Sequence, residues 1–165
     1  MPVRIVALVI LVASLAPCAS AAASTPQEPI MRHATGTFDV KIVPQTPDND
    51  GARTGGVGRI ALDKRFHGAL DATGAGEMLY AGDGTEDGAY VAIERVSGRL
   101  DGHEGSFQLV HHALMEGSTP TRWTVTVVPG SGTGALAGLR GEMRIVIENK
   151  VHHYELDYVL PEATP

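Results

Sequence analysis

The sequence predicts an all-β protein, an eight-stranded antiparallel β-barrel. Apolar side chains recur at every second position in one segment after another, which is the period of a strand with one buried face. Beyond the N-terminal segment, no stretch has the 3.6-residue period of an amphipathic helix. The composition, with 20 Gly and 10 Pro but only 3 Phe, favours many turns over long helices. A chain of 165 residues suits a single domain with a core of its own.

We expect residues 1–21 to be a signal peptide. A short, positively charged start (1–4) precedes an apolar run (5–15), and a string of small residues follows. The apolar run is shorter than the about 20 residues that a helix needs to span a bilayer. We therefore expect a periplasmic or secreted protein without a membrane span. Residues 22–33 would form a flexible lead before the folded domain.

Cys18 offers an alternative to ordinary cleavage. It is the only cysteine in the chain, so no intramolecular disulfide can form. Its context, "LAPC", is similar to the lipid-attachment box of bacterial lipoproteins. Pro17 fits that box poorly, because the processing enzyme needs a small residue other than proline before the cysteine. Lipid anchoring at Cys18 is therefore the less favoured alternative.

Eight strands are expected in a domain that covers 34–161, before a short tail (162–165). Their segments are 34–43, 58–70, 76–81, 89–101, 105–115, 121–128, 140–148 and 151–160. A polar loop (44–56) follows the first strand. The turn "DGHEG" (101–105) carries the Asp-Gly signal that favours tight hairpins, and Asn149-Lys150 is a two-residue link compatible with a hairpin. Eight antiparallel strands can pack as a sandwich, but closure into a barrel removes exposed sheet edges.

Five blocks along the domain resemble a known family. They are "ATGTFDV", "RFHGALDATGAGEML", "GAYVAIERVSGRLDGHEGSFQLVHHALM", "TVTVVPGSGTGALAGLRGEM" and "HHYELDYVLP", in this order from Ala34 to Pro161. Together they resemble the DUF3224 family of bacterial proteins of unknown function. The resemblance implies an eight-stranded barrel like that of allene oxide cyclase, and it implies no established activity. It also implies a usual family histidine at His111 and at His152, with His112 and His153 at variable positions.

A polar cluster is expected inside the barrel. His111 shares its face of the strand with apolar side chains: Phe107, Leu109, Ala113 and Met115. For 89–101 we favour Tyr90, Ala92, Glu94 and Val96 as the inward set over Val91, Ile93 and Arg95. A β-bulge would reverse that choice. Because a buried charge needs a partner, we expect Glu94 to pair with His111 and to raise the pKa of the imidazole. Lys64 and His152 are further candidates for the interior.

Three functions are compatible with this interior. We favour a barrel that binds a small, largely apolar molecule, since no motif specifies an activated nucleophile, a metal or a cofactor. The expected ligand-binding walls are Phe66, Tyr90, Leu109, Trp123, Tyr154 and Tyr158. The alternative is an isomerase- or cyclase-type enzyme in which Glu94 and His111 are the catalytic acid and base. The second alternative is a filled barrel with a structural or interaction role. A homo-oligomer built on the barrel walls is also left open.

Several other site classes are disfavoured by the sequence. "GTGALA" satisfies the dinucleotide fingerprint in spacing, yet a strand and not a helix is expected after it, so we predict a glycine-rich connection and no NAD. Neighbouring histidines on a strand point to opposite faces, so His111-His112 and His152-His153 do not predict a metal site. The formal net charge of −6 argues against a nucleic-acid partner.

Overall fold

The computed structural model describes residues 30–82, 86–117 and 119–161, and most of them lie in β-strands. The longer strands are β1 (Met31–Gln45), β2 (Val57–Gly68), β3 (Leu70–Gly82), β4 (Gly88–Leu100), β5 (His103–Glu116), β6 (Thr119–Val127), β8 (Arg140–Glu148) and β9 (Val151–Val159). A two-residue strand, β7 (Thr133–Gly134), and a five-residue helix, α1 (Asp50–Thr54), complete the elements that these residues form. The expected signal peptide, Cys18 and the tail 162–165 lie outside the described residues.

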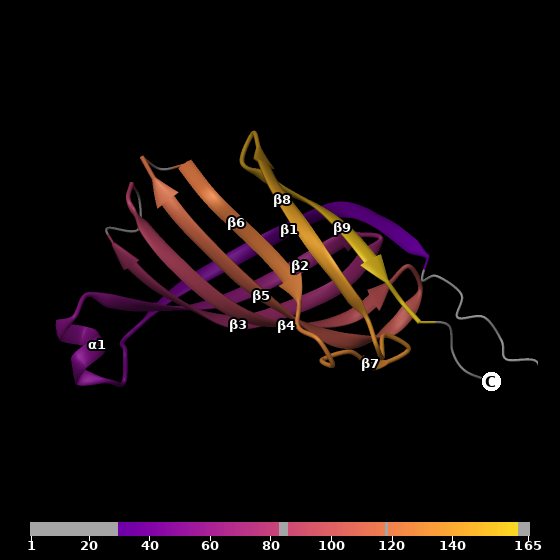
Figure 1. The fold of residues 1–165 in the computed structure, drawn as a ribbon, viewed down its shortest axis with the longest axis horizontal. Coiled ribbons are helices and arrows are strands. Elements are labelled where there is room, and N and C mark those ends of the chain that lie inside the picture. Colours follow the sequence, from indigo (N-terminus) through magenta and orange to yellow (C-terminus); the bar gives the residue numbers. More distant parts are fainter. Residues whose placement is uncertain (1–29, 83–85, 118, 162–165) are drawn as a thin grey trace, which may run out of the picture.

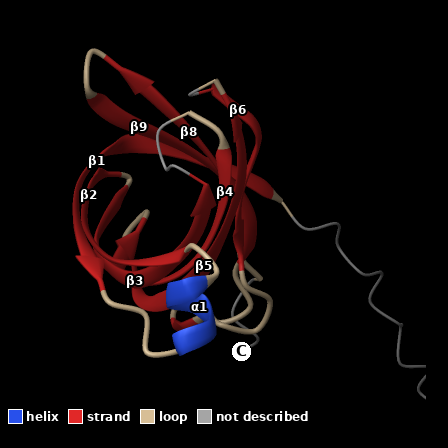
Figure 2. Ribbon diagram, turned by 90° about the vertical axis from the view of Figure 1, so that its left-hand side faces the viewer, coloured by secondary structure: helices blue, strands red, loops and turns tan. Residues whose placement is uncertain are grey.

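The strands close into a barrel (Figures 1 and 2). Among the described residues, the sheet runs β4-β3-β2-β1-β9-β8-β6-β5, and β5 pairs with β4 to complete the ring. Each of these pairings is antiparallel. The predicted eight-stranded antiparallel barrel is therefore confirmed, while its likeness to allene oxide cyclase stays a prediction.

The largest differences from the expected strand boundaries are at the starts of β1 and β3. β1 begins at Met31, which pairs with Val159 of β9, so the last three residues of the expected lead belong to the sheet. β3 begins at Leu70 and has 13 residues, whereas only 76–81 were expected. Its first half, "LDATGA", carries small side chains that weaken the alternating pattern, although Ala72 is fully buried.

Both predicted hairpin links are confirmed. Asp101 and Gly102 have φ values of 48° and 81°, and Asn149 and Lys150 have values of 51° and 67°. Two consecutive positive φ values are the mark of a type I′ turn, whose twist matches that of the strands it joins. The adjacent pairs Leu100↔His103 and Glu148↔Val151 fix the register of each hairpin.

The glycine-rich segment after β6 is a connection between strands, as predicted. Its central residues form β7, which pairs with Gly105 and Ser106 of β5, and the chain then continues into β8. Leu136 and Leu139 of the same loop are buried at 1% and 0% exposure. The loop therefore closes the end of the barrel where β5 begins.

The apolar core fills only this end of the barrel. Its largest fully buried side chains include Tyr154, Tyr158, Phe66 and Phe107. The Tyr154 hydroxyl accepts a hydrogen bond from the Leu70 amide at 2.8 Å, and the Tyr158 hydroxyl donates one to Asp101 at 2.6 Å. Each phenol thus places its ring in the core and satisfies its polar end at the barrel rim.

One seam of the barrel is weak. β8 pairs with β9 along its whole length, whereas its pairing with β6 is limited to Thr126↔Glu142. Beyond this pair the two strands are not paired, and Figure 2 shows the tip of the β8–β9 hairpin standing apart from the start of β6. In the part of the chain that the structure describes, no helix has the length and apolar character needed to cross a bilayer.

Candidate functional site

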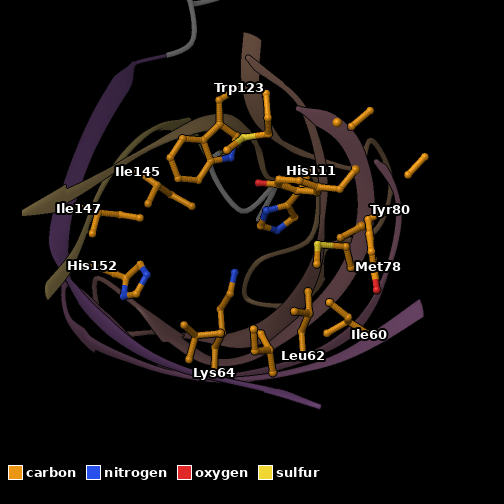
Figure 3. Close-up of a pocket in the computed structure, with 18 of the residues that line it drawn as sticks. Ile60, Leu62, Lys64, Met78, Tyr80, His111, Trp123, Ile145, Ile147 and His152 are labelled. Atoms are coloured by element: carbon orange, nitrogen blue, oxygen red, sulfur yellow. The ribbon is translucent and has the colours of Figure 1, made fainter. Parts of the chain in front are cut away.

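The end of the barrel opposite the core is hollow. It holds a cavity of about 460 Å³ with mostly apolar walls (Figure 3). The walls include Phe38, Val40, Ile60, Leu62, Met78, Tyr80, Tyr90, Ala92, Met115, Trp123, Ile145 and Ile147. The last two come from β8, beside the weak seam, so the cavity extends to the place where the sheet is least tightly joined.

A layer of three polar side chains separates the hollow end from the filled end. On β2, Lys64 lies between Leu62 of the cavity and Phe66 of the core. Glu94 and His111 occupy the corresponding boundary on β4 and β5. Lys64 and His111 line the cavity, and Figure 3 shows both pointing into it from different walls. The polar layer is therefore the floor of the cavity.

Glu94 links the three residues. Its Oε2 accepts a hydrogen bond from Lys64 Nζ at 2.7 Å and contacts His111 Nε2 at 3.1 Å. Glu94 has no exposed surface, and it is not part of the cavity lining. Its Oε1 lies against Gly74, where an added Cβ would overlap it. The glycine therefore makes room for the buried carboxylate.

The electrostatics of the layer favour a charged Glu94 and a neutral His111. Burial alone would raise the pKa of Glu94, but the hydrogen bond from His111 and the charge of Lys64 hold that pKa below its usual value. Burial lowers the pKa of His111, and the Lys64 charge lowers it further, which outweighs the attraction of Glu94. Glu94 does act to raise the His111 pKa, as expected, but burial and the Lys64 charge lower it by more, so the net shift is downward. The expectation left out the cost of burial, which is the largest cause.

This charge state sets the hydrogen-bonding pattern of the floor. The neutral imidazole donates from Nε2 to the carboxylate, which leaves Nδ1 as an acceptor. The Lys64 ammonium also lies 4.9 Å from the centre of the Phe38 ring. With Lys64 positive, Glu94 negative and His111 neutral, the layer carries no net charge.

Further polar groups lie in the cavity wall. Trp123 Nε1 is buried, and no hydrogen-bond acceptor reaches it among the described residues. A buried donor left unpaired costs about 1–3 kcal/mol. Burial raises the pKa of the neighbouring Tyr90 phenol to about 12. His152, which also lines the cavity, packs against Phe38 with the two rings tilted and their centres 4.9 Å apart.

The structure divides the predicted site residues between the two ends. Glu94 and His111 are in contact, and Tyr90 and Trp123 line the cavity. The other four expected wall residues are buried in the apolar core: Phe66, Leu109, Tyr154 and Tyr158. Alternation shows which side chains face inward, but the height of each one in the barrel depends on the register between strands. The cavity residues of β1, Phe38 and Val40, were missed for this reason.

No metal centre is formed by the part of the chain that the structure covers. It contains no group of three or more His, Cys, Asp or Glu residues placed to hold an ion. His111 faces the interior and His112 is exposed on the outer wall, as expected for neighbours on a strand.

Sequence and structure comparisons identify the family. A family model described as "Protein of unknown function (DUF3224)" matches residues 34–158. The chain belongs to this family. A crystal structure of a DUF3224 protein of unknown function from Shewanella oneidensis MR-1 is similar, with 45% sequence identity and a TM-score of 0.71. The similarity covers 80% of this chain and 99% of that one. Among curated proteins, no sequence matches the chain significantly.

The chemistry available to this DUF3224 site follows from its geometry. Apolar walls provide a driving force for binding that is roughly proportional to the apolar area removed from water. Lys64 and His111 present polar atoms at the floor, whereas Glu94 acts only through them. The arrangement therefore suits the orientation of a bound molecule by its polar end.

Proposed function

We propose that this DUF3224 protein binds a small, largely apolar molecule in the hollow end of its barrel. The observation that carries the proposal is the cavity of about 460 Å³ above a polar layer without net charge. Its volume falls within the roughly 300–1,000 Å³ of typical small-molecule sites, and its mostly apolar lining is also typical of them. The proposed lining includes Tyr90 and Trp123 from the sequence prediction and adds the cavity residues of β1, β2 and β8.

The geometry supports binding over the two alternatives. The alternative of a barrel filled with side chains is disfavoured by the hollow end, where a cavity of about 460 Å³ remains. An acid–base pair needs both groups within reach of the substrate. Glu94 is fully buried, and its Oε2 already serves both Lys64 and His111. This arrangement supports the orientation of a ligand more than proton transfer to or from it.

The proposal includes export from the cytoplasm. It is supported by the charged start, the apolar run and the small residues of the first 21 positions. Intact-mass measurement on the protein purified from its own cells tests this part. A mass that corresponds to loss of about the first 21 residues supports export, and added mass of a lipid on Cys18 supports the anchored alternative. Retention of the complete N-terminus would contradict both.

Binding can be tested with N-phenyl-1-naphthylamine, an uncharged apolar probe whose fluorescence rises in an apolar site. The decisive variant is Ile145→Trp, which fills part of the cavity from β8. Its matched control is Ile93→Trp, at a side chain that is 57% exposed on the outer wall. We expect saturable binding to the native protein and to Ile93→Trp, and at least about tenfold weaker binding to Ile145→Trp, a difference of about 1.4 kcal/mol.

The control separates cavity binding from adhesion to the outer wall. Equal binding by native protein and Ile145→Trp would place the probe outside the cavity and contradict the proposal. Thermal unfolding of both variants, followed by circular dichroism, ensures that they are compared as folded proteins.

A further inference from the structure

The cavity wall contains a donor without an acceptor. Trp123 Nε1 is buried at the hollow end of the barrel, and no described residue accepts its hydrogen bond. The Tyr90 hydroxyl is its polar neighbour: the indole N–H acts to lower the pKa of this phenol, against the larger effect of burial, although no hydrogen bond of normal geometry joins the two. Buried N–H groups in proteins are nearly always paired. The unpaired indole therefore points to an acceptor that the described residues do not supply.

The strand register places a second donor beside the first. Tyr90 of β4 and Trp123 of β6 are both opposite Ala113 of β5, one on each side. All three face the interior, and the small Ala113 side chain is fully buried between the two larger ones, which line the cavity. Burial raises the pKa of Tyr90 to about 12, so the phenol keeps its proton at neutral pH and can donate. An O–H and an N–H donor thus flank one position in the wall.

The charge of the cavity limits which acceptor can bind there. Lys64 is already paired with Glu94 at 2.7 Å, and His111 is neutral, so neither of these floor residues offers an unpaired positive charge to an anion. A carboxylate ligand would bring a net negative charge into an apolar pocket, which is costly without a partner. An uncharged carbonyl oxygen accepts two hydrogen bonds without this cost.

We propose that Tyr90 and Trp123 form a subsite for the carbonyl oxygen of an uncharged, apolar ligand, such as a ketone or an ester. This inference rests on the proposed function, because it assigns the ligand class of the same cavity. It makes Tyr90 and Trp123 the residues that set specificity, while the apolar walls supply affinity without regard to the carbonyl.

Three naphthalenes of nearly equal size test the inference by isothermal titration calorimetry on the purified protein. They are 2-acetylnaphthalene, which has the ketone, 2-isopropenylnaphthalene, in which a CH₂ group replaces the oxygen, and 2-naphthoate, which is charged. We expect the ketone to bind about tenfold more tightly than the alkene, as two neutral hydrogen bonds allow. The naphthoate should bind more weakly than the ketone.

Two isosteric variants assign the preference to the subsite. Trp123→Phe and Tyr90→Phe each remove one donor and keep an aromatic ring, so each should reduce the ketone preference to about threefold or less and leave alkene binding nearly unchanged. The matched control is Thr124→Val, on the exposed face of β6 next to Trp123. It should keep the tenfold preference. Unchanged alkene binding also shows that each variant is folded.

The outcomes separate the two proposals. If the alkene binds but the ketone has no advantage, or if the advantage survives both donor variants, the carbonyl subsite is refuted and the apolar binding function stands. Tighter binding of 2-naphthoate than of the ketone refutes the uncharged ligand class. If neither the alkene nor the ketone binds to the native protein, the proposed function fails together with this inference.

Discussion

Glu94 is the residue on which the polar layer depends. Its carboxylate is fully buried and compensates the charge of Lys64 at 2.7 Å. Removal of one partner from a buried ion pair leaves a charge without compensation and costs about 3–5 kcal/mol. We therefore expect Lys64→Met to lower the free energy of unfolding by about this amount, measured by urea denaturation.

An exposed ion pair provides the comparison for Lys64. Arg144 donates to Glu155 at 2.6 Å on the outside of the barrel, and both side chains are at least 40% exposed. Arg144→Met should cost at most about 1 kcal/mol, because water screens such pairs. In the Lys64→Met background, Glu94→Gln should restore part of the loss, since it removes the unpaired charge. Equal effects of Lys64→Met and Arg144→Met would show that the pair is not buried as described.

The pKa of His111 predicts how stability depends on pH. Burial and Lys64 hold this pKa below its ordinary value of 6.5 in the folded protein. Below pH 6.5 the unfolded chain therefore takes up a proton that the folded protein does not, and the free energy of unfolding falls as the pH falls. The lowered pKa of Glu94 adds a loss of the same sign below its ordinary value of 4.5.

Urea denaturation of His111→Gln between pH 6.5 and 4.5 isolates this contribution. The native protein should lose stability more steeply with falling pH than the variant, by up to about 1.4 kcal/mol per pH unit for one proton. His112→Gln, at the exposed neighbour on β5, is the matched control and should follow the native slope. The prediction fails if native protein and His111→Gln have parallel pH profiles.

At the scale of elements, the β8–β9 hairpin contains avoidable strain. Lys150 has φ of 67° in the turn, a conformation that costs a residue with a Cβ about 1–2 kcal/mol. Glycine adopts it freely but loses about 0.5–1 kcal/mol of backbone entropy on folding. The first effect is larger, so Lys150→Gly should stabilise the protein by about 0.5–1 kcal/mol in urea denaturation.

Lys41→Gly in β1 tests whether the benefit depends on the turn. Lys41 is exposed in a regular strand, where glycine brings only the entropic loss. This control should destabilise the protein by about 0.5–1 kcal/mol. If Lys150→Gly also destabilises the protein, the left-handed conformation of Lys150 does not reduce its stability as proposed.

The sequence predicted the strands and their inward faces well, but it did not predict the position of each inward side chain along the barrel axis. Alternation alone identified the inward face of β4, with Glu94 inside, and the faces of β5 and β9. The Asp-Gly signal and the two-residue link Asn149-Lys150 predicted both hairpins, which the structure shows to have I′ turns. The hollow end could not be predicted in this way, because residues far apart in the chain define it. Tyr154 and Trp123 look equivalent in their strands, yet one lies in the core and the other at the cavity.

For the whole molecule, the β6–β8 seam is where the barrel should open first. All other neighbouring strands of the ring pair over eight or more positions, whereas β6 and β8 pair at Thr126↔Glu142. The cavity lies beside this seam, since Trp123 and Ile145 come from its two sides. A ligand that contacts both strands would replace part of the missing sheet contacts, so binding and closure of the seam should be coupled.

Hydrogen exchange measured by NMR tests this coupling. Without ligand, the amides of 143–148 that point away from β9 should exchange through local opening. Their exchange rates should therefore not change at low urea concentrations. Amides between β3 and β4, which pair without interruption, should exchange only through global unfolding, with a strong dependence on urea. Saturating N-phenyl-1-naphthylamine should slow exchange at both places, because a ligand that binds only the folded state stabilises it by about 2.7 kcal/mol at 100 times its dissociation constant. Slower exchange between β3 and β4 with no change at 143–148 would mean that the seam opens while the ligand stays bound. Ligand binding and closure of the seam would then be independent.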